Sequence, residues 1–125
     1  MSEPSKPPRL RIEAGAKRDA DELTELFLED GEALALRYLD ELAAVYRRIE
    51  NFPEGCWFYE EPVRCCLFPG LLCEALFEIE EDGIWVYVVA HQHEDSKSIL
   101  KRLHQRRRAP GRREAAREEE PEEGL

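Results

Sequence analysis

Two histidines and two carboxylates follow one another where an apolar segment ends. The segment Gly83–Ala90, GIWVYVVA, is typical of a β-strand, and it leads directly into HQHED at residues 91–95. His91 and His93 are two residues apart, so in an extended chain their side chains point the same way. With Glu94 or Asp95 they offer the donors of a metal site, and histidine is also a common general acid or base at neutral pH. A partner-binding edge and a plain polar strand exit, with His91 bonded to neighbouring backbone, are the other interpretations.

A metal site is the weakest of these interpretations. No third histidine or cysteine stands at ligand spacing from the pair, and the four cysteines, at positions 56, 65, 66 and 73, contain no C-x-x-C motif. We therefore expect no metal and no cofactor. In a cytoplasmic protein these cysteines are expected to stay reduced.

Length and charge narrow the function further. A chain of 125 residues has room for one small domain, and no stretch approaches the ~18 apolar residues of a membrane span. The polar start, MSEPSKPPRLRIEAG, has no signal-peptide core, so we expect a cytoplasmic protein.

The net charge is carried by the body of the chain. Gln105–Leu125 holds six Arg and six Glu, so the whole net charge of −10 falls in Met1–His104. An acidic surface repels phosphate, which makes direct nucleic-acid binding unlikely and suits a basic protein partner.

The first half of the chain predicts a short strand and two helices. Arg9–Glu13 alternates as an edge strand does, and Asp19 with Glu22 resembles a capping box at the start of a helix. Asp30 can cap a second helix, whose apolar stripe includes Leu39 and Leu42 and which Phe52-Pro53 stops. The break between them is short, so the two helices should form an antiparallel hairpin.

The second half predicts strands. After a loop, GCWFYEEP, segments 63–68, 73–80 and 84–91 alternate in hydrophobicity, and Glu81-Asp82-Gly83 supplies a hairpin turn. Both faces of the last strand are apolar, so it should be interior, with residues 84, 86, 88 and 90 on one face. Ser96 can cap a third helix, which Ala109-Pro110-Gly111 ends. We predict an α+β domain at residues 9–104 with its helices on one sheet face, a disordered lead-in at 1–8 and a charged low-complexity tail at 105–125.

Four segments, in order, resemble the RelE/ParE toxins of bacterial type II toxin–antitoxin modules. They are AGAKRDADELTELFLED, EALALRYLDELAAVYRRIENFPE, PVRCCLFPG with Arg64, and EDGIWVYVVAHQHEDSKSIL. The resemblance runs from Leu10 to about Leu103. His91, Gln92 and Asp95 fit the family's pattern after its last strand, whereas Glu94 replaces the usual arginine.

The resemblance implies a toxin that a cognate antitoxin neutralises, and it leaves the mechanism open. ParE-like members bind DNA gyrase and have no recognised nucleophile; RelE-like members cut messenger RNA on the ribosome with basic residues and a tyrosine or histidine. The helix hairpin and VVAHQH favour the ParE side, and thus binding without enzymatic activity. For the RelE alternative the catalytic candidates are Arg64, Tyr87 and His91. A third alternative is a degenerate member that binds antitoxin without toxicity.

The candidate partner-binding residues are grouped in two segments. One holds Arg64 and the aromatic run Trp57-Phe58-Tyr59, because three aromatics in one loop cannot all enter a small core. The other is the strand exit with His91, His93, Glu94 and Asp95. Arg64 has a plain structural alternative, an ion pair with Glu74 or Glu78 across the sheet. The arginines at 106–108 and 112–113 could contact nucleic acid, but the glutamates that follow offset their charge, so we expect a solvated tail. Oligomeric state is left open.

Overall fold

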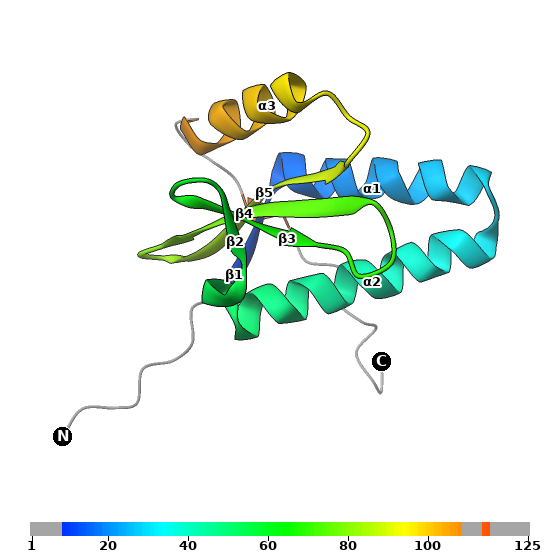
Figure 1. Ribbon diagram of the computed structural model, residues 1–125, viewed down its shortest axis with the longest axis horizontal. Coiled ribbons are helices and arrows are strands. Elements are labelled where there is room, and N and C mark those ends of the chain that lie inside the picture. Colours follow the sequence, from blue (N-terminus) through cyan, green and yellow to red (C-terminus); the bar gives the residue numbers. More distant parts are fainter. Residues whose placement is uncertain (1–8, 109–113, 116–125) are drawn as a thin grey trace.

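The computed structural model describes residues 9–108 and 114–115, which form three α-helices and one six-stranded sheet (Figure 1). The α+β class is confirmed. In chain order the elements are β1 (Leu10–Glu13), α1 (Ala14–Glu29), α2 (Glu32–Asn51), the 3-10 turn η1 (Pro53–Gly55), β2 (Trp57–Glu60), β3 (Val63–Leu67), β4 (Cys73–Glu80), β5 (Gly83–His91), α3 (Ser96–Arg108) and β6 (Glu114–Ala115). The expected lead-in at residues 1–8 lies outside the described residues, as do residues 109–113 and 116–125 of the expected tail. None of the described helices is long and apolar enough to cross a bilayer.

The sheet has the order β2-β3-β4-β5-β1-β6, with β5 in its interior as expected. The predicted meander β3-β4-β5 is antiparallel throughout, and β1 joins β5 in parallel. Two expectations were wrong. The segment read as a loop contains the strand β2, which pairs with β3 and forms one edge of the sheet. At the other side β1 is not an edge, because β6 pairs with it and Glu114 forms ion pairs with Arg9 and Arg11.

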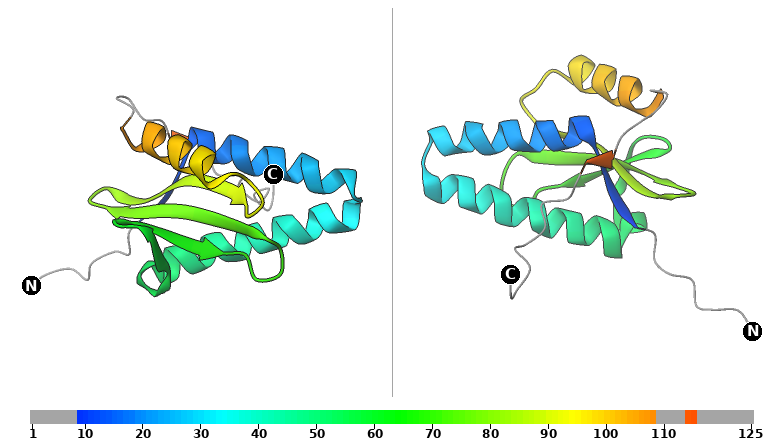
Figure 2. Two further views of the ribbon diagram at one scale, coloured as in Figure 1. Left: turned by 45° about the horizontal axis from the view of Figure 1, so that its top comes forward. Right: turned by 180° about the vertical axis from the view of Figure 1, so that it is seen from behind.

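The helices cover both faces of the sheet, not one as predicted. The antiparallel pair α1 and α2 lies against one face, and α3 lies across the other (Figure 2). Each face has its own core: the residues that α1 and α2 cover include Phe77 and Val86, whereas Ile99 and Leu103 of α3 pack against Leu76 and its neighbours. The physical reason is β5 itself, because a strand that is apolar on both faces needs cover on both.

A β-bulge changes which side chains of β5 share a face. Val88 lies opposite Leu76 and Val86 opposite Phe77, so Tyr87 is an extra residue in the ladder. Tyr87 and Val88 therefore both belong to the α3 core, and Val89 moves to the α1–α2 core. The strict alternation predicted for 84–91 was correct only up to Tyr87.

The helix ends also differ from the predicted caps. Helix α1 begins at Ala14, where the Glu13 carboxylate accepts hydrogen bonds from the amides of Gly15 and Ala16. Asp19 therefore lies inside the helix and caps nothing. Gly31, with φ of 124°, stands at the N-cap of α2 in place of Asp30. On α2, Leu42 packs partly against the core, but Leu39 is exposed, contrary to expectation.

Candidate functional site

The strand exit after β5 is a tight turn held by its own side chains. The His91 amide donates to Glu94 Oε2 at 2.8 Å, and the His93 amide donates to His91 Nδ1 at 3.1 Å. The two imidazole rings stack with centroids 4.7 Å apart. Because Nδ1 accepts a hydrogen bond, this arrangement needs the neutral His91 tautomer with its proton on Nε2. His91 thus has a structural task at the end of the strand.

Glu94 is fastened to the fold and is not a free loop charge. Its second carboxylate oxygen pairs with Arg102 Nη1 on α3 at 2.9 Å, and its side chain is 35% exposed. The Asp95 carbonyl accepts the first amide bond of α3, from Ile99, while its side chain is exposed. Within the described part of the chain, no three His, Cys, Asp or Glu side chains come together as a metal site would require.

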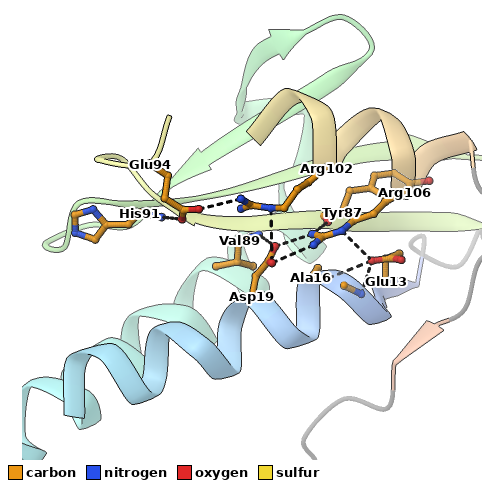
Figure 3. A network of polar contacts seen from close by, with 10 residues as sticks. Glu13, Ala16, Asp19, Tyr87, Val89, His91, Glu94, Arg102 and Arg106 are labelled. Atoms are coloured by element: carbon orange, nitrogen blue, oxygen red, sulfur yellow. Dashed lines mark hydrogen bonds and ion pairs between the residues drawn. The ribbon is translucent and has the colours of Figure 1, made fainter. Parts of the chain in front are cut away.

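A network of buried and half-buried charges extends from this turn along β5, between α1 and α3 (Figure 3). Asp19 of α1 binds Arg106 of α3 through two contacts, at 2.6 and 3.1 Å, and Arg102 Nε approaches the same carboxylate at 3.8 Å. The side chains of Asp19 and Arg106 are only 9% and 15% exposed. Two hydrogen bonds to one carboxylate are the strong geometry for arginine. The expectation of solvated arginines was therefore wrong for Arg106, and likewise for Arg107, which pairs with Glu78 at 2.7 Å.

The same network supplies hydrogen-bond partners for backbone groups of β5 beyond the point where its pairing with β1 ends. The last parallel pair joins Ile12 to Val86. Beyond it, the Tyr87 carbonyl accepts from Arg106 at 2.8 Å, and the Val89 amide donates to Asp19 at 3.2 Å. Buried backbone groups need such partners. The network therefore attaches α3 to α1 and closes the irregular part of β5.

The three catalytic candidates do not come together. Arg64 lies opposite Phe77, which lies opposite Val86. Arg64 is therefore two strands away from His91 and about five residues away along the strand direction, roughly 16 Å at 3.3 Å per residue. Arg64 lies on the sheet face that α1 and α2 cover, whereas Tyr87 belongs to the core beneath α3. The Tyr87 ring is fully buried, and its hydroxyl donates to Glu80.

Arg64 and the aromatic run, by contrast, do lie together on the edge of the sheet. Arg64 lies opposite Phe58, and its guanidinium stacks 4.1 Å from that ring. It also donates to the Cys56 carbonyl at 2.9 Å, so the predicted partners Glu74 and Glu78 were wrong. Trp57 on the strand's other face is 83% exposed, and Phe58 is 49% exposed. We call Trp57, Phe58 and Tyr59 the β2 edge.

The surroundings of the β2 edge are apolar and acidic. Phe52 before it and Leu67 on the neighbouring strand are exposed as well. Residues 50–62 contain four glutamates and neither lysine nor arginine. Of these glutamates Glu60 pairs with His104 at 2.8 Å, and the Arg64 guanidinium over Phe58 is a cation at this edge. Among the residues that the structure describes, β2 has a neighbouring strand on one side only. An exposed aromatic edge strand of this kind is a surface onto which an extended segment of another protein can pair.

Sequence reasoning missed Asp19 and Arg106 as a pair, although one signal was present. Asp19 stands within the buried face of α1, among Ala16, Ala20 and Leu23, and a carboxylate on an apolar stripe requires a buried partner. No protein-family model matches this chain, and no curated protein matches it significantly.

Proposed function

We propose that this protein is the toxin component of a type II toxin–antitoxin module, similar to the RelE/ParE family and nearer its ParE side, and that it acts by binding proteins in the cytoplasm. One observation carries the proposal: the catalytic candidates are dispersed and committed to structural contacts, while the β2 edge exposes aromatic side chains. The order of strand, helix hairpin, meander and third helix accords with the family resemblance.

Messenger-RNA cleavage is the weaker alternative because its chemistry lacks a centre. Transfer of a proton from a 2′-hydroxyl needs a base and a cation that stabilises the charged phosphate within one site. Here His91 supports the turn, Tyr87 is buried against Glu80, and Arg64 stacks on Phe58 at another part of the sheet. Arg102 and Arg106 are already neutralised by carboxylates.

The partner that fits the β2 edge is a cognate antitoxin with an extended segment that carries apolar residues on both of its faces and basic residues beside them. Its amides and carbonyls would continue the sheet beside β2, and one apolar side chain on each face would cover Trp57 and Phe58, which point to opposite faces. Its cations would face the glutamates around the strand. A second copy of this chain fits less well, because two acidic edges repel each other. The proposed target, DNA gyrase, rests on the family resemblance alone.

A degenerate member that binds antitoxin without toxicity is favoured by one specific contact. Glu94 stands where the family has arginine, and its carboxylate is taken up by Arg102 and the His91 amide. A target that requires a cation at that turn would find none from Glu94. An active toxin and a degenerate member would both bind the antitoxin, so only their effect on the target distinguishes them.

Two assays separate these functions. Added to a gyrase supercoiling reaction, the purified protein should inhibit it, and in a translating extract it should leave messenger RNA intact. Site-specific cuts that disappear in His91→Ala would establish the nuclease instead. Antitoxin binding without gyrase inhibition or growth arrest would establish the degenerate member.

The binding edge has its own test. Trp57→Ala should weaken antitoxin binding tenfold or more, since a large exposed aromatic is a typical hot spot, without changing the unfolding midpoint. Leu28→Ala is a matched control, because Leu28 is exposed at 52% on α1, away from the β2 edge. Equal affinity of both variants would exclude the β2 edge as the binding surface.

A further inference from the structure

Two cysteines lie one step beyond the end of the β2–β3 ladder, whose first pair is Trp57 with Cys65. The register pairs Trp57 with Cys65 and Phe58 with Arg64, so its continuation places Cys56 opposite Cys66. Cys56 has the extended conformation this requires, with φ −96° and ψ 150°. Directly opposed residues of antiparallel strands have Cα atoms about 4.5–5.5 Å apart, and disulfides span about 4.4–6.8 Å.

The backbone contacts of Cys56 suit the closer kind of cross-strand pair. Its amide donates to the Pro53 carbonyl at 3.4 Å, and its carbonyl accepts from Arg64 at 2.9 Å. Its hydrogen-bonding groups are thus engaged away from Cys66, as in a non-hydrogen-bonded pair, whose side chains approach more closely. Both side chains belong to the same buried cluster. Burial, together with the adjacent Cys56 thiol, raises the pKa of Cys66 to about 12.

The other two cysteines lack such a partner. Cys65 packs on the opposite face of the sheet, where its thiol donates to Glu74 at 3.3 Å. Cys73 lies on β4 opposite His91. Successive residues of a strand point to opposite faces, so Cys65 and Cys66 do not share a face. Only one of the cysteine pairs among the described residues is therefore opposed in register.

We propose that Cys56 and Cys66, which are free thiols and would stay so in a reducing cytoplasm, form a cross-strand disulfide under oxidising conditions, by exchange with a small-molecule disulfide such as oxidised glutathione. The thiolate of one cysteine attacks a sulfur of that disulfide, forming a mixed disulfide and releasing one small thiol. The second cysteine, after losing its proton to water, attacks the protein sulfur and releases the second small thiol. Two cysteines are oxidised and one small disulfide is reduced to two thiols.

The position of the pair determines its rate and its effect. Cys66 is 2% exposed and Cys56 is 6% exposed, so exchange requires a local opening of the sheet edge. Cys56 directly precedes the edge strand, which makes it the first thiol that such an opening reaches. Oxidation is therefore slow in the folded protein. Once formed, the bond attaches the start of β2 to β3 and limits the opening of the β2 edge.

The reaction can be followed on the unaltered full chain. Incubation with oxidised glutathione should remove two of its four free thiols, and tandem mass spectrometry of the digest should identify a Cys56–Cys66 link. Cys66→Ser should abolish the link, while Cys73→Ser, another buried cysteine of the same cluster, should retain it. Four remaining thiols, stable glutathione adducts alone, or a link through Cys65 or Cys73 would each overturn the proposal.

The effect of the disulfide on the opening of β2 is measured by amide hydrogen exchange, again on the unaltered chain. Amides of Trp57–Glu60 should exchange more slowly in the oxidised protein than in the reduced one, while amides of α1 should exchange at unchanged rates. Equal exchange rates of the β2 amides in the oxidised and reduced proteins would refute the proposal that the bond restrains the β2 edge. These results do not depend on the proposed function: a protein that binds no antitoxin would still form the bond, and antitoxin binding would persist if it did not.

Discussion

Asp19→Ala is the change that most directly tests the buried charge network. It removes the carboxylate that receives both Arg106 contacts, the Val89 amide and the approach of Arg102. The variant leaves a cation that is only 15% exposed and one buried amide without their main partner. Its effect on the free energy of unfolding should therefore be large.

The magnitude follows from two contributions. Breaking a buried ion pair by removing one partner typically lowers the free energy of unfolding by about 3–5 kcal/mol. Arg106 keeps the Tyr87 carbonyl and the more distant Glu13 carboxylate, at 3.8 Å, which reduces that loss. The orphaned Val89 amide adds about 1–3 kcal/mol. The partners that Arg106 keeps roughly offset the contribution of the Val89 amide, so we expect a net loss of about 3–4 kcal/mol, a large fraction of the ~5–15 kcal/mol of a typical domain.

Urea unfolding followed by circular dichroism measures this loss. At a slope of about 2 kcal/mol per molar urea, the midpoint should fall by roughly 1.5–2 M. Asp21→Ala is the matched control, because Asp21 lies on the same helix and pairs with Lys17 at 2.6 Å, but its side chain is 57% exposed. An exposed pair contributes at most about 1 kcal/mol. If both variants shift the midpoint equally, the network does not hold α3 on the domain.

Three further changes test the local structure by the same unfolding measurement. In Gly15→Ala the new Cβ would lie 2.6 Å from Arg106 Cζ, so we expect a loss of about 1–3 kcal/mol from overpacking; a neutral result would show that the guanidinium moves aside freely. Glu94→Arg would place a second guanidinium beside that of Arg102 at the turn after β5, and it should lower the free energy of unfolding by about 1–2 kcal/mol. An effect below about 0.5 kcal/mol would mean that Glu94 behaves as an unpaired surface charge. Leu42→Ala, at a half-buried site, should cost about 1–2 kcal/mol and clearly more than Leu39→Ala on the exposed face; the reverse order would mean that the buried side of α2 is assigned wrongly.

The parts of the fold that sequence reasoning predicted are those that local patterns determine. Alternating residues and the Glu81-Asp82-Gly83 turn identified β4 and β5, because strand periodicity and the positive φ of Gly83 are properties of a few neighbouring residues. The end of α2 before Pro53 was predicted for the same reason. Such signals need no information about distant partners.

The missed features depend on contacts between distant segments. The bulge at Tyr87 cannot be read from alternation, because an extra residue in β5 is defined only by its pairing with β4. Asp19 followed by Glu22 has the local form of a capping box, yet Glu13, six residues before Asp19, caps the helix, and Asp19 binds a side chain 87 positions away. The β2 strand was read as part of a loop because it is only four residues long and its register comes only from β3.

The third helix shows why a basic sequence is not by itself a binding surface. SKSILKRLHQRRR resembles a cationic patch for nucleic acid, but Arg102, Arg106 and Arg107 are each held by a carboxylate of the turn, of α1 or of β4. On this helix Lys97 and Lys101 are exposed, and they cannot outweigh a net charge of −10. An approaching molecule therefore meets a negative electrostatic potential, which favours a basic protein over a nucleic acid. Because exposed charges are screened beyond about 8–10 Å at physiological salt, association with the proposed antitoxin should slow as salt rises. Its dissociation, which we propose is controlled by apolar contacts at the β2 edge, should change little.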